Sequence, residues 1–177
     1  MIAAPLKIKK AMIDYSKKPK YDFIKTPKYA VLPLLKYLPK EKLTIWECAD
    51  AGDSKITDTL KENGYNVINT DILTGFDFLK DTPDFNFDII ITNPPYSLKD
   101  EWLYKCYEYN KPFALLLPLT ALEGITRGNM YRQNTISLIV LDRRVSFTGD
   151  SSWFAVGWFL WKMDIGNKLY FEELKKT

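Results

Sequence analysis

Hydrophobic residues recur along this chain in short continuous runs that are separated by longer segments of mixed polarity. Three runs have the length of a strand buried on both faces of a sheet: Leu43–Ala49, Phe87–Thr92 and Pro112–Leu117. Between the first two, Ser54–Asn63 has a polar start, and Gly64 follows as the residue type that commonly ends helices. The alternation predicts an α/β fold with a mostly parallel, doubly wound, Rossmann-like sheet.

The other expected elements follow from the same signals. We expect helical segments at Thr26–Tyr37, near Phe76–Lys80, over Ser97–Tyr109 and, as a helix or a loop, from Leu117 up to Gln133. We expect further strands at Asn66–Thr70, Thr135–Leu141 and Trp153–Trp161. No helix is obvious in Asp142–Ser152, which joins the last two strands, and this favours an antiparallel pair.

Composition narrows the class of protein. With 177 residues, 46% of them hydrophobic and 15% aromatic, the chain is expected to form a packed domain. It has no apolar stretch of membrane-spanning length and no signal peptide, so we expect a cytoplasmic protein without a membrane partner. Cys48 and Cys106 are most simply buried, reduced thiols. Two cysteines and no histidine argue against a metal site.

Charge is distributed unevenly along the chain. Residues 1–28 contain eight lysines and two aspartates, a net charge of +6, which leaves −3 for the rest of a chain whose total is +3. Tyr15, Tyr21 and Phe23 lie among these lysines. We therefore expect a basic arm over 1–28, suited to a nucleic-acid backbone, and one catalytic domain over 29–177. A solvated lysine-rich tail is the alternative for the arm.

The tetrapeptide Asn93-Pro94-Pro95-Tyr96, called the acceptor loop below, is the most informative motif. It follows the buried run Phe87–Thr92 and precedes an expected helix with Ser97 as its N-cap. It therefore lies at the carboxyl end of a strand, where open α/β sheets bind their ligands. The arrangement resembles the signature loop of S-adenosylmethionine-dependent amino-methyltransferases, which holds a planar amine for methylation.

The chemistry of amine methylation accounts for these residue types. The lone pair of a nucleobase or amide nitrogen is delocalised, so fixed acceptors for its two hydrogens favour a pyramidal, nucleophilic nitrogen. The side-chain oxygen of Asn93 and the carbonyl of Pro94 are the expected acceptors. Pro95 adds stiffness, and the ring of Tyr96 is expected to stack on the flat acceptor group. Alternatively, the two prolines only end a strand and start a turn.

The resemblance covers nearly the whole chain after the arm and is closest to small, phage-type adenine-specific DNA methyltransferase-like proteins. It implies a seven-stranded sheet whose last strand is antiparallel, with S-adenosylmethionine as the cofactor. It places Thr26-Pro27 near the methionine end, Asp71 at the ribose hydroxyls, and Asp77-Phe78 at the adenine. The implied cofactor-binding residues are Thr26, Pro27, Glu47, Ala49, Asp50, Gly52, Asp71, Ile72, Asp77 and Phe78.

Each of these positions also has a plainer interpretation. Asp71 is suited to capping a helix, and Asp77-Phe78 to a capping acid followed by a core aromatic. The first loop departs from the family pattern, because the two family glycines become Ala51 and Asp53 when the chains are aligned on Glu47. A binding protein that kept the fold and lost the cofactor is therefore an alternative.

Three further residues are expected to contact the substrate. Phe147 resembles the aromatic that sandwiches an extruded base opposite Tyr96, and Arg143 and Arg144 are placed to contact phosphate. The alternative for Phe147 is an ordinary aromatic at the edge of the domain, and the alternative for Arg143 and Arg144 is a solvated loop. The sequence thus predicts methyl transfer to an exocyclic amine, with adenine in DNA preferred. Adenine in RNA and the glutamine side chain of a protein are alternative substrates.

Overall fold

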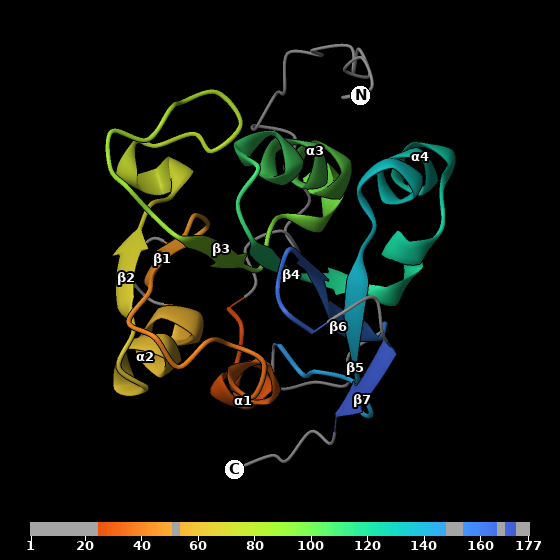
Figure 1. Cartoon of the computed structure of the whole chain (residues 1–177), viewed down its shortest axis with the longest axis horizontal. Coiled ribbons are helices and arrows are strands. Elements are labelled where there is room, and N and C mark those ends of the chain that lie inside the picture. Colours follow the sequence, from red (N-terminus) through yellow and green to blue (C-terminus); the bar gives the residue numbers. More distant parts are fainter. Residues whose placement is uncertain (1–24, 51–53, 148–153, 166–168, 173–177) are drawn as a thin grey trace.

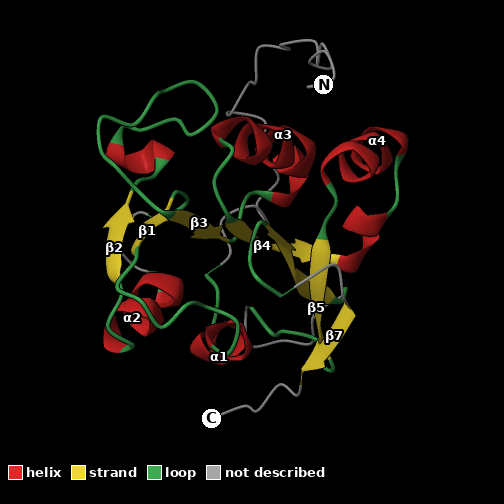
Figure 2. Ribbon diagram, in the orientation of Figure 1, coloured by secondary structure: helices red, strands yellow, loops and turns green. Residues whose placement is uncertain are grey.

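The chain folds around one seven-stranded sheet with the strand order β2-β1-β3-β4-β6-β5-β7 (Figure 1). The computed structural model describes residues 25–50, 54–147, 154–165 and 169–172, the last of these as backbone only. Helices α1 and α2 cover one face of the sheet, and α3 and α4 cover the other (Figure 2). The predicted doubly wound α/β fold is confirmed.

The elements follow one another in the alternating order that the sequence predicts. The helices are α1 (Lys28–Leu35), α2 (Lys55–Glu62), α3 (Lys99–Tyr109) and α4 (Ile125–Asn134). The strands are β1 (Thr44–Glu47), β2 (Asn66–Asn69), β3 (Ile89–Thr92), β4 (Phe113–Pro118), β5 (Ser137–Leu141), β6 (Val156–Trp161) and β7 (Leu169–Glu172). Short 3₁₀ helices span Ile72–Thr74, Tyr96–Leu98 and Leu119–Leu122.

The continuous apolar runs form central strands because successive side chains alternate between two separate cores. Ile89 and Ile91 contribute to the core beneath α1 and α2, whereas Ile90 contributes to the core beneath α3. All six residues of β4 are buried. At about 25 cal/mol per Å² of apolar surface, such double-sided burial is the main stabilising contribution to this fold.

One strand of the sheet runs against the others. β1, β2, β3 and β4 pair in parallel, whereas β6 is antiparallel to both β4 and β5. The expected antiparallel pairing of Thr135–Leu141 with Trp153–Trp161 is confirmed. A further strand, β7, follows the reversed strand and pairs in parallel with β5.

Two local predictions were wrong. Residues 76–80 form turns and no helix; Phe76 and Phe78 instead pack their rings around Trp46 on β1. Ser97 lies inside the 3₁₀ helix Tyr96–Leu98 and does not cap α3, whose N-cap is Leu98. In the first case tertiary packing decides the backbone, because the local helix signal is short. None of the helices in the described ranges combines the length and apolarity needed to cross a bilayer.

Candidate active site at the carboxyl edge of the sheet

The acceptor loop lies at the point where the strand order of the sheet reverses. From β1 the chain goes to β2 on one side, and then to β3 on the other side of β1 (Figure 1). Trp46 of β1 is aligned with Ile90 of β3, so Glu47 and Thr92 end their strands next to each other. Such a switch point is the place where open α/β sheets leave a crevice for ligands.

The chain leaves β3 through a stiff turn. Pro94 is buried, and Pro95 has φ −58° and ψ 121°, which leads directly into the 3₁₀ helix Tyr96–Leu98. The amide of Leu98 donates to the carbonyl of Pro95 at 3.0 Å, and Lys99 Nζ donates to the carbonyl of Tyr96 at 3.3 Å. The side-chain oxygen of Asn93 is buried at this turn. The structure thus brings the four acceptor-loop residues together at the end of a central strand.

Tyr96 packs against an aromatic that the sequence did not single out. Its ring lies edge-to-face with Phe154, with 5.6 Å between the ring centroids and 73° between the planes. The Tyr96 hydroxyl is buried, has no hydrogen-bond partner among the described residues, and has a pKa raised by burial. Phe147 is half-buried against the core beneath α1, and its predicted contact with a base stays a prediction.

Two buried acids lie at the end of β1, beside the strand that leads into the acceptor loop. Glu47 is 1% exposed and Asp50 is 3% exposed. The Asp50 side chain accepts from the amide of Ser54 at 3.0 Å and also from the Thr57 hydroxyl and the Asn69 amide. These donors come from the start of α2 and the end of β2, and they hold the Asp50 side chain in place.

Glu47 has a different environment. Its Oε1 accepts from the amide of Ala49 at 3.2 Å, and no lysine or arginine in the described ranges forms an ion pair with it. Burial raises the pKa of Glu47 from 4.5 to about 8, the Thr92 hydroxyl opposes this rise, and the nearby charge of Asp50 adds to it. Glu47 is therefore mainly protonated at neutral pH.

The acid that follows β2 caps a short helix. Asp71 Oδ1 accepts from the amide of Leu73 at 2.7 Å and completes a capping box with Thr74. Ile72, also predicted to bind the cofactor, is the first residue of that 3₁₀ helix and is half-buried. One oxygen of Asp71, Oδ1, thus caps the short helix. Its binding to the ribose hydroxyls of a cofactor stays a prediction.

The residues predicted to hold an adenine have structural contacts of their own. Asp77 accepts from the amide of Leu79 at 3.1 Å and forms an ion pair with Lys80 at 2.8 Å. Phe78 is 2% exposed and stacks on Trp102 of α3, with centroids 4.2 Å apart. The structure gives Phe78 a place in the core, and contact of this pair with a cofactor stays a prediction.

The remaining predicted residues lie around the same sheet at different depths. Thr26 is 3% exposed just before α1, and Pro27 is the N-cap of that helix. Arg143 and Arg144 are exposed after β5, as contact with a polyanion would require. Gly52, together with Ala51 and Asp53, and the basic arm up to residue 24 lie outside the described residues.

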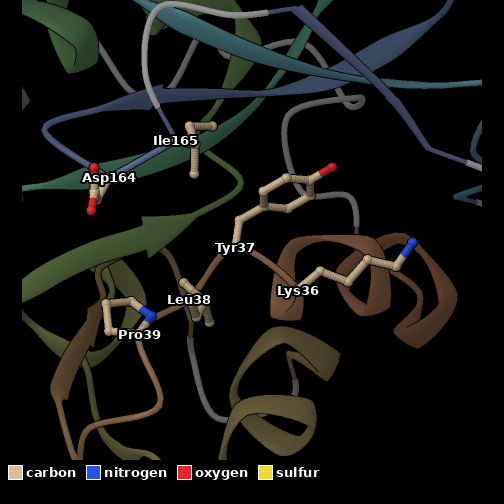
Figure 3. A pocket seen from close by; sticks show the side chains of 6 residues that line it. All are labelled: Lys36, Tyr37, Leu38, Pro39, Asp164 and Ile165. Carbon is tan, nitrogen blue, oxygen red and sulfur yellow. The ribbon is translucent and has the colours of Figure 1, made fainter.

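A separate pocket lies at the edge of the sheet where β1 begins, opposite the edge that carries the acceptor loop. Figure 3 shows the side chains that line it. The pocket has a volume of about 420 Å³. The chain passes it just before β1 begins and just after β6, the reversed strand, ends, so it is remote from the acceptor loop. The pocket is lined by Lys36, Tyr37, Leu38, Pro39, Asp164 and Ile165. We assign no function to it.

Sequence reasoning missed two features of this site. Phe154 lies inside the expected strand Trp153–Trp161, and nothing in its local sequence indicates contact with Tyr96. Thr92 was treated as the end of a strand, although its buried hydroxyl is close enough to influence Glu47. A weak signal existed for the buried acid itself, because Glu47 is the one charged residue in the apolar run Leu43–Ala49.

Comparison with known proteins supports the fold. No protein-family model matches the chain, and no curated protein matches it in sequence. Among solved structures, a putative class I S-adenosylmethionine-dependent methyltransferase from Listeria monocytogenes is similar with a TM-score of 0.63 and 14% identity, over 91% of this chain and 69% of that one. A type I restriction-modification methyltransferase subunit from Streptococcus thermophilus has a TM-score of 0.58 and 16% identity.

The restriction-modification proteins are considerably longer than this chain. The match to the Streptococcus subunit covers 85% of this chain and 47% of that one. A second protein, from a study of type I restriction-modification complex assembly, has a TM-score of 0.63 and 11% identity, over 88% of this chain and 45% of its own. The chain thus spans about half the length of these two relatives. At such identities the likeness shows a Rossmann-like methyltransferase fold.

Proposed function

We propose that this protein transfers a methyl group from S-adenosylmethionine to an exocyclic amino group, with adenine in DNA as the preferred substrate. The observation that carries the proposal is the position of the acceptor loop. Asn93 to Tyr96 leave β3 at the switch point of a methyltransferase-type sheet, where a cofactor and an acceptor group can meet.

The described residues fit a positively charged cofactor. Glu47 is a buried acid at the switch point without an ion-pair partner among the described residues, and a cationic ligand would supply that partner. When bound, S-adenosylmethionine would supply a methyl group on a sulfonium. Glu47, Asp50 and Asp71 are the residues we expect to hold it, since they end β1 and β2 beside the crevice.

The protein's own residues then prepare the amine. Asn93 Oδ1 and the Pro94 carbonyl accept hydrogen bonds from the two amine hydrogens, which favours a pyramidal nitrogen and stabilises the charge that develops on it. Bound S-adenosylmethionine would supply the methyl group to this nitrogen with its thioether as the leaving group, and the amine would lose one proton to water. Tyr96 and Phe154, already in edge-to-face contact, form an aromatic wall for a flat group.

DNA is preferred over the other acceptors for two reasons. The basic arm of residues 1–28 and the exposed Arg143 and Arg144 suit a phosphate backbone. The aromatic pair at the acceptor loop suits a nucleobase more closely than a glutamine side chain, because a base offers a larger flat face for stacking. Two of the structural neighbours also come from restriction-modification systems.

The test is transfer of labelled methyl from S-adenosylmethionine to DNA, RNA and protein extracts supplied separately. Asn93→Ala should reduce transfer by at least about 100-fold, as the loss of one preorganised hydrogen-bonding group does elsewhere. Asn63→Ala, on the surface at the end of α2, is the matched control. Full activity of the Asn93 variant would show that the acceptor loop is only a turn. If labelled methyl appeared only in RNA or only in protein, that class of molecule would be the substrate in place of DNA.

A further inference from the structure

The buried acid Glu47 lacks the counter-charge that such a group needs. It is 1% exposed, the amide of Ala49 donates to it at 3.2 Å, and the other groups that lower its pKa, the hydroxyls of Thr92 and Ser54, are neutral. A carboxylate buried among neutral groups is costly, so it retains its proton or finds a cation. Within the described ranges no basic side chain forms an ion pair with it.

The other titratable groups around Glu47 do not supply a positive charge. On its own segment it faces Asp50, whose negative charge opposes ionisation of Glu47, and Cys48, whose thiol pKa is raised well above its usual value by burial. From β3 it faces the Thr92 hydroxyl, and from the start of α2 the Ser54 hydroxyl. The site therefore holds one neutral carboxyl beside a second buried acid.

The location of this carboxyl connects it to the proposed reaction. Glu47 ends β1, and Thr92 ends the neighbouring β3 immediately before Asn93 (Figure 1). Glu47 therefore immediately precedes the loop that is expected to hold the cofactor, and it lies beside the strand that leads into the loop expected to hold the amine. A cation bound at this point would face a carboxyl that can become its counter-ion.

We propose that Glu47 responds to the charge of the cofactor: it releases its proton when the sulfonium form binds and recovers one when the neutral thioether product is left. This inference rests on the proposed function and deepens it. The substrate and product forms differ by the sulfonium methyl and its positive charge. The site therefore binds the charged form more tightly than the spent form, which assists product release.

The charges balance over one turnover. The carbon–sulfur bond breaks and leaves its electron pair on sulfur, so the positive charge passes to the methylated nitrogen. That nitrogen loses one proton to water. Glu47, without its cation, takes one proton from water and becomes neutral again. No oxidant, reductant or further reactant is needed.

Calorimetric titration of the full chain tests the inference without measuring methyl transfer. S-adenosylmethionine and S-adenosylhomocysteine are titrated between pH 6.5 and 8.5, in two buffers of different ionisation enthalpy. We expect about one proton released on binding of the sulfonium form at pH 7, and an affinity that rises up to about 10-fold per pH unit before levelling near pH 8. The thioether form should show neither effect.

Two variants identify the group that titrates. Glu47→Gln should abolish the proton release and the rise of affinity for the sulfonium form with pH. The variant should also prefer the sulfonium form over the thioether less strongly than the wild type does. Glu41→Gln makes the same change at an exposed glutamate and should keep the wild-type behaviour. Proton release by the wild-type protein is measured independently, so the test remains valid if Glu47→Gln fails to fold.

The remaining outcomes overturn the inference in distinguishable ways. Equal proton release with both ligands would mean that their shared ammonium group is the partner, and the sulfonium assignment would be wrong. Binding of the sulfonium form without proton release would refute the role of Glu47 while leaving the proposed function intact. Binding of neither ligand at millimolar concentration would refute the proposed function and this inference together.

Discussion

Replacing Glu47 by glutamine should change how the stability of the unliganded protein depends on pH. In the folded protein burial raises the pKa of Glu47 to about 8, whereas in the unfolded chain the ordinary value of 4.5 applies. Between these values the folded state holds a proton that the unfolded state has lost. Stability therefore falls as the pH rises through this window, and this contribution becomes constant above pH 8.

The magnitude follows from the size of that shift. One pKa unit corresponds to about 1.4 kcal/mol, so Glu47 should lower the free energy of unfolding by roughly 3 kcal/mol between pH 5 and 7.5. Glutamine has nearly the same shape, can still accept from the Ala49 amide, and does not ionise. The Glu47→Gln variant should therefore lose this slope and be more stable than the wild type at pH 8.5.

The assay is urea unfolding followed by tryptophan fluorescence at a series of pH values. The difference between wild type and variant isolates Glu47, because the other titratable groups contribute to both proteins. Glu41→Gln, an exposed control, should show the wild-type slope. Parallel pH profiles for the wild type and Glu47→Gln would show that the folded pKa of Glu47 is not raised, and the reasoning from burial would be refuted.

Three further predictions concern other parts of the molecule. Tyr96→Phe removes a buried hydroxyl that lacks a partner among the described residues, so thermal unfolding should show a stabilisation of about 1 kcal/mol, with methyl transfer retained; a loss of stability would mean that the hydroxyl is satisfied. Gly157→Ala should destabilise the protein by about 2 kcal/mol in urea unfolding, because its Cβ would lie 2.8 Å from the Ile139 carbonyl oxygen on the neighbouring strand β5; wild-type stability would mean that β6 can shift to make room for the methyl group. Deleting residues 1–20 should weaken DNA binding and flatten its dependence on salt, with cofactor affinity unchanged; an unaltered salt slope would assign the arm to solvent.

The sequence predicted six of the seven strands of the sheet because their hydrophobic patterns are local, whereas β7 was not among the strands predicted. The apolar runs Phe87–Thr92 and Pro112–Leu117 became β3 and β4, each within two residues of the expected bounds. Ser54 caps α2 with its hydroxyl, 3.1 Å from the amide of Ile56, as a polar residue before a helix predicts. These elements depend on side-chain alternation and capping, which are properties of neighbouring residues.

Features that depend on distant residues were not predictable in the same way. The segment 76–80 is held by aromatic packing on Trp46, which lies far away in the sequence, and a local helix signal did not survive this packing. Similarly, the contact of Tyr96 with the ring of Phe154 depends on how the chain returns to the sheet after β5, and the sequence had indicated Phe147 instead. Such contacts join residues about thirty to sixty positions apart, so no short motif encodes them.

The sequence alone determined the composition of the candidate site, and the tertiary structure determined its environment. Asn93-Pro94-Pro95-Tyr96 after an apolar run was sufficient to predict a turn at the end of a strand, since the order of strand, turn and helix is local, and its role in holding an amine stays a prediction. Glu47 lies beside Thr92 only because the fold pairs β1 with β3, and the same fold buries both side chains away from water. Because the ionisation of a carboxyl depends on its burial and its neighbours, the charge of this site is a property of the folded chain.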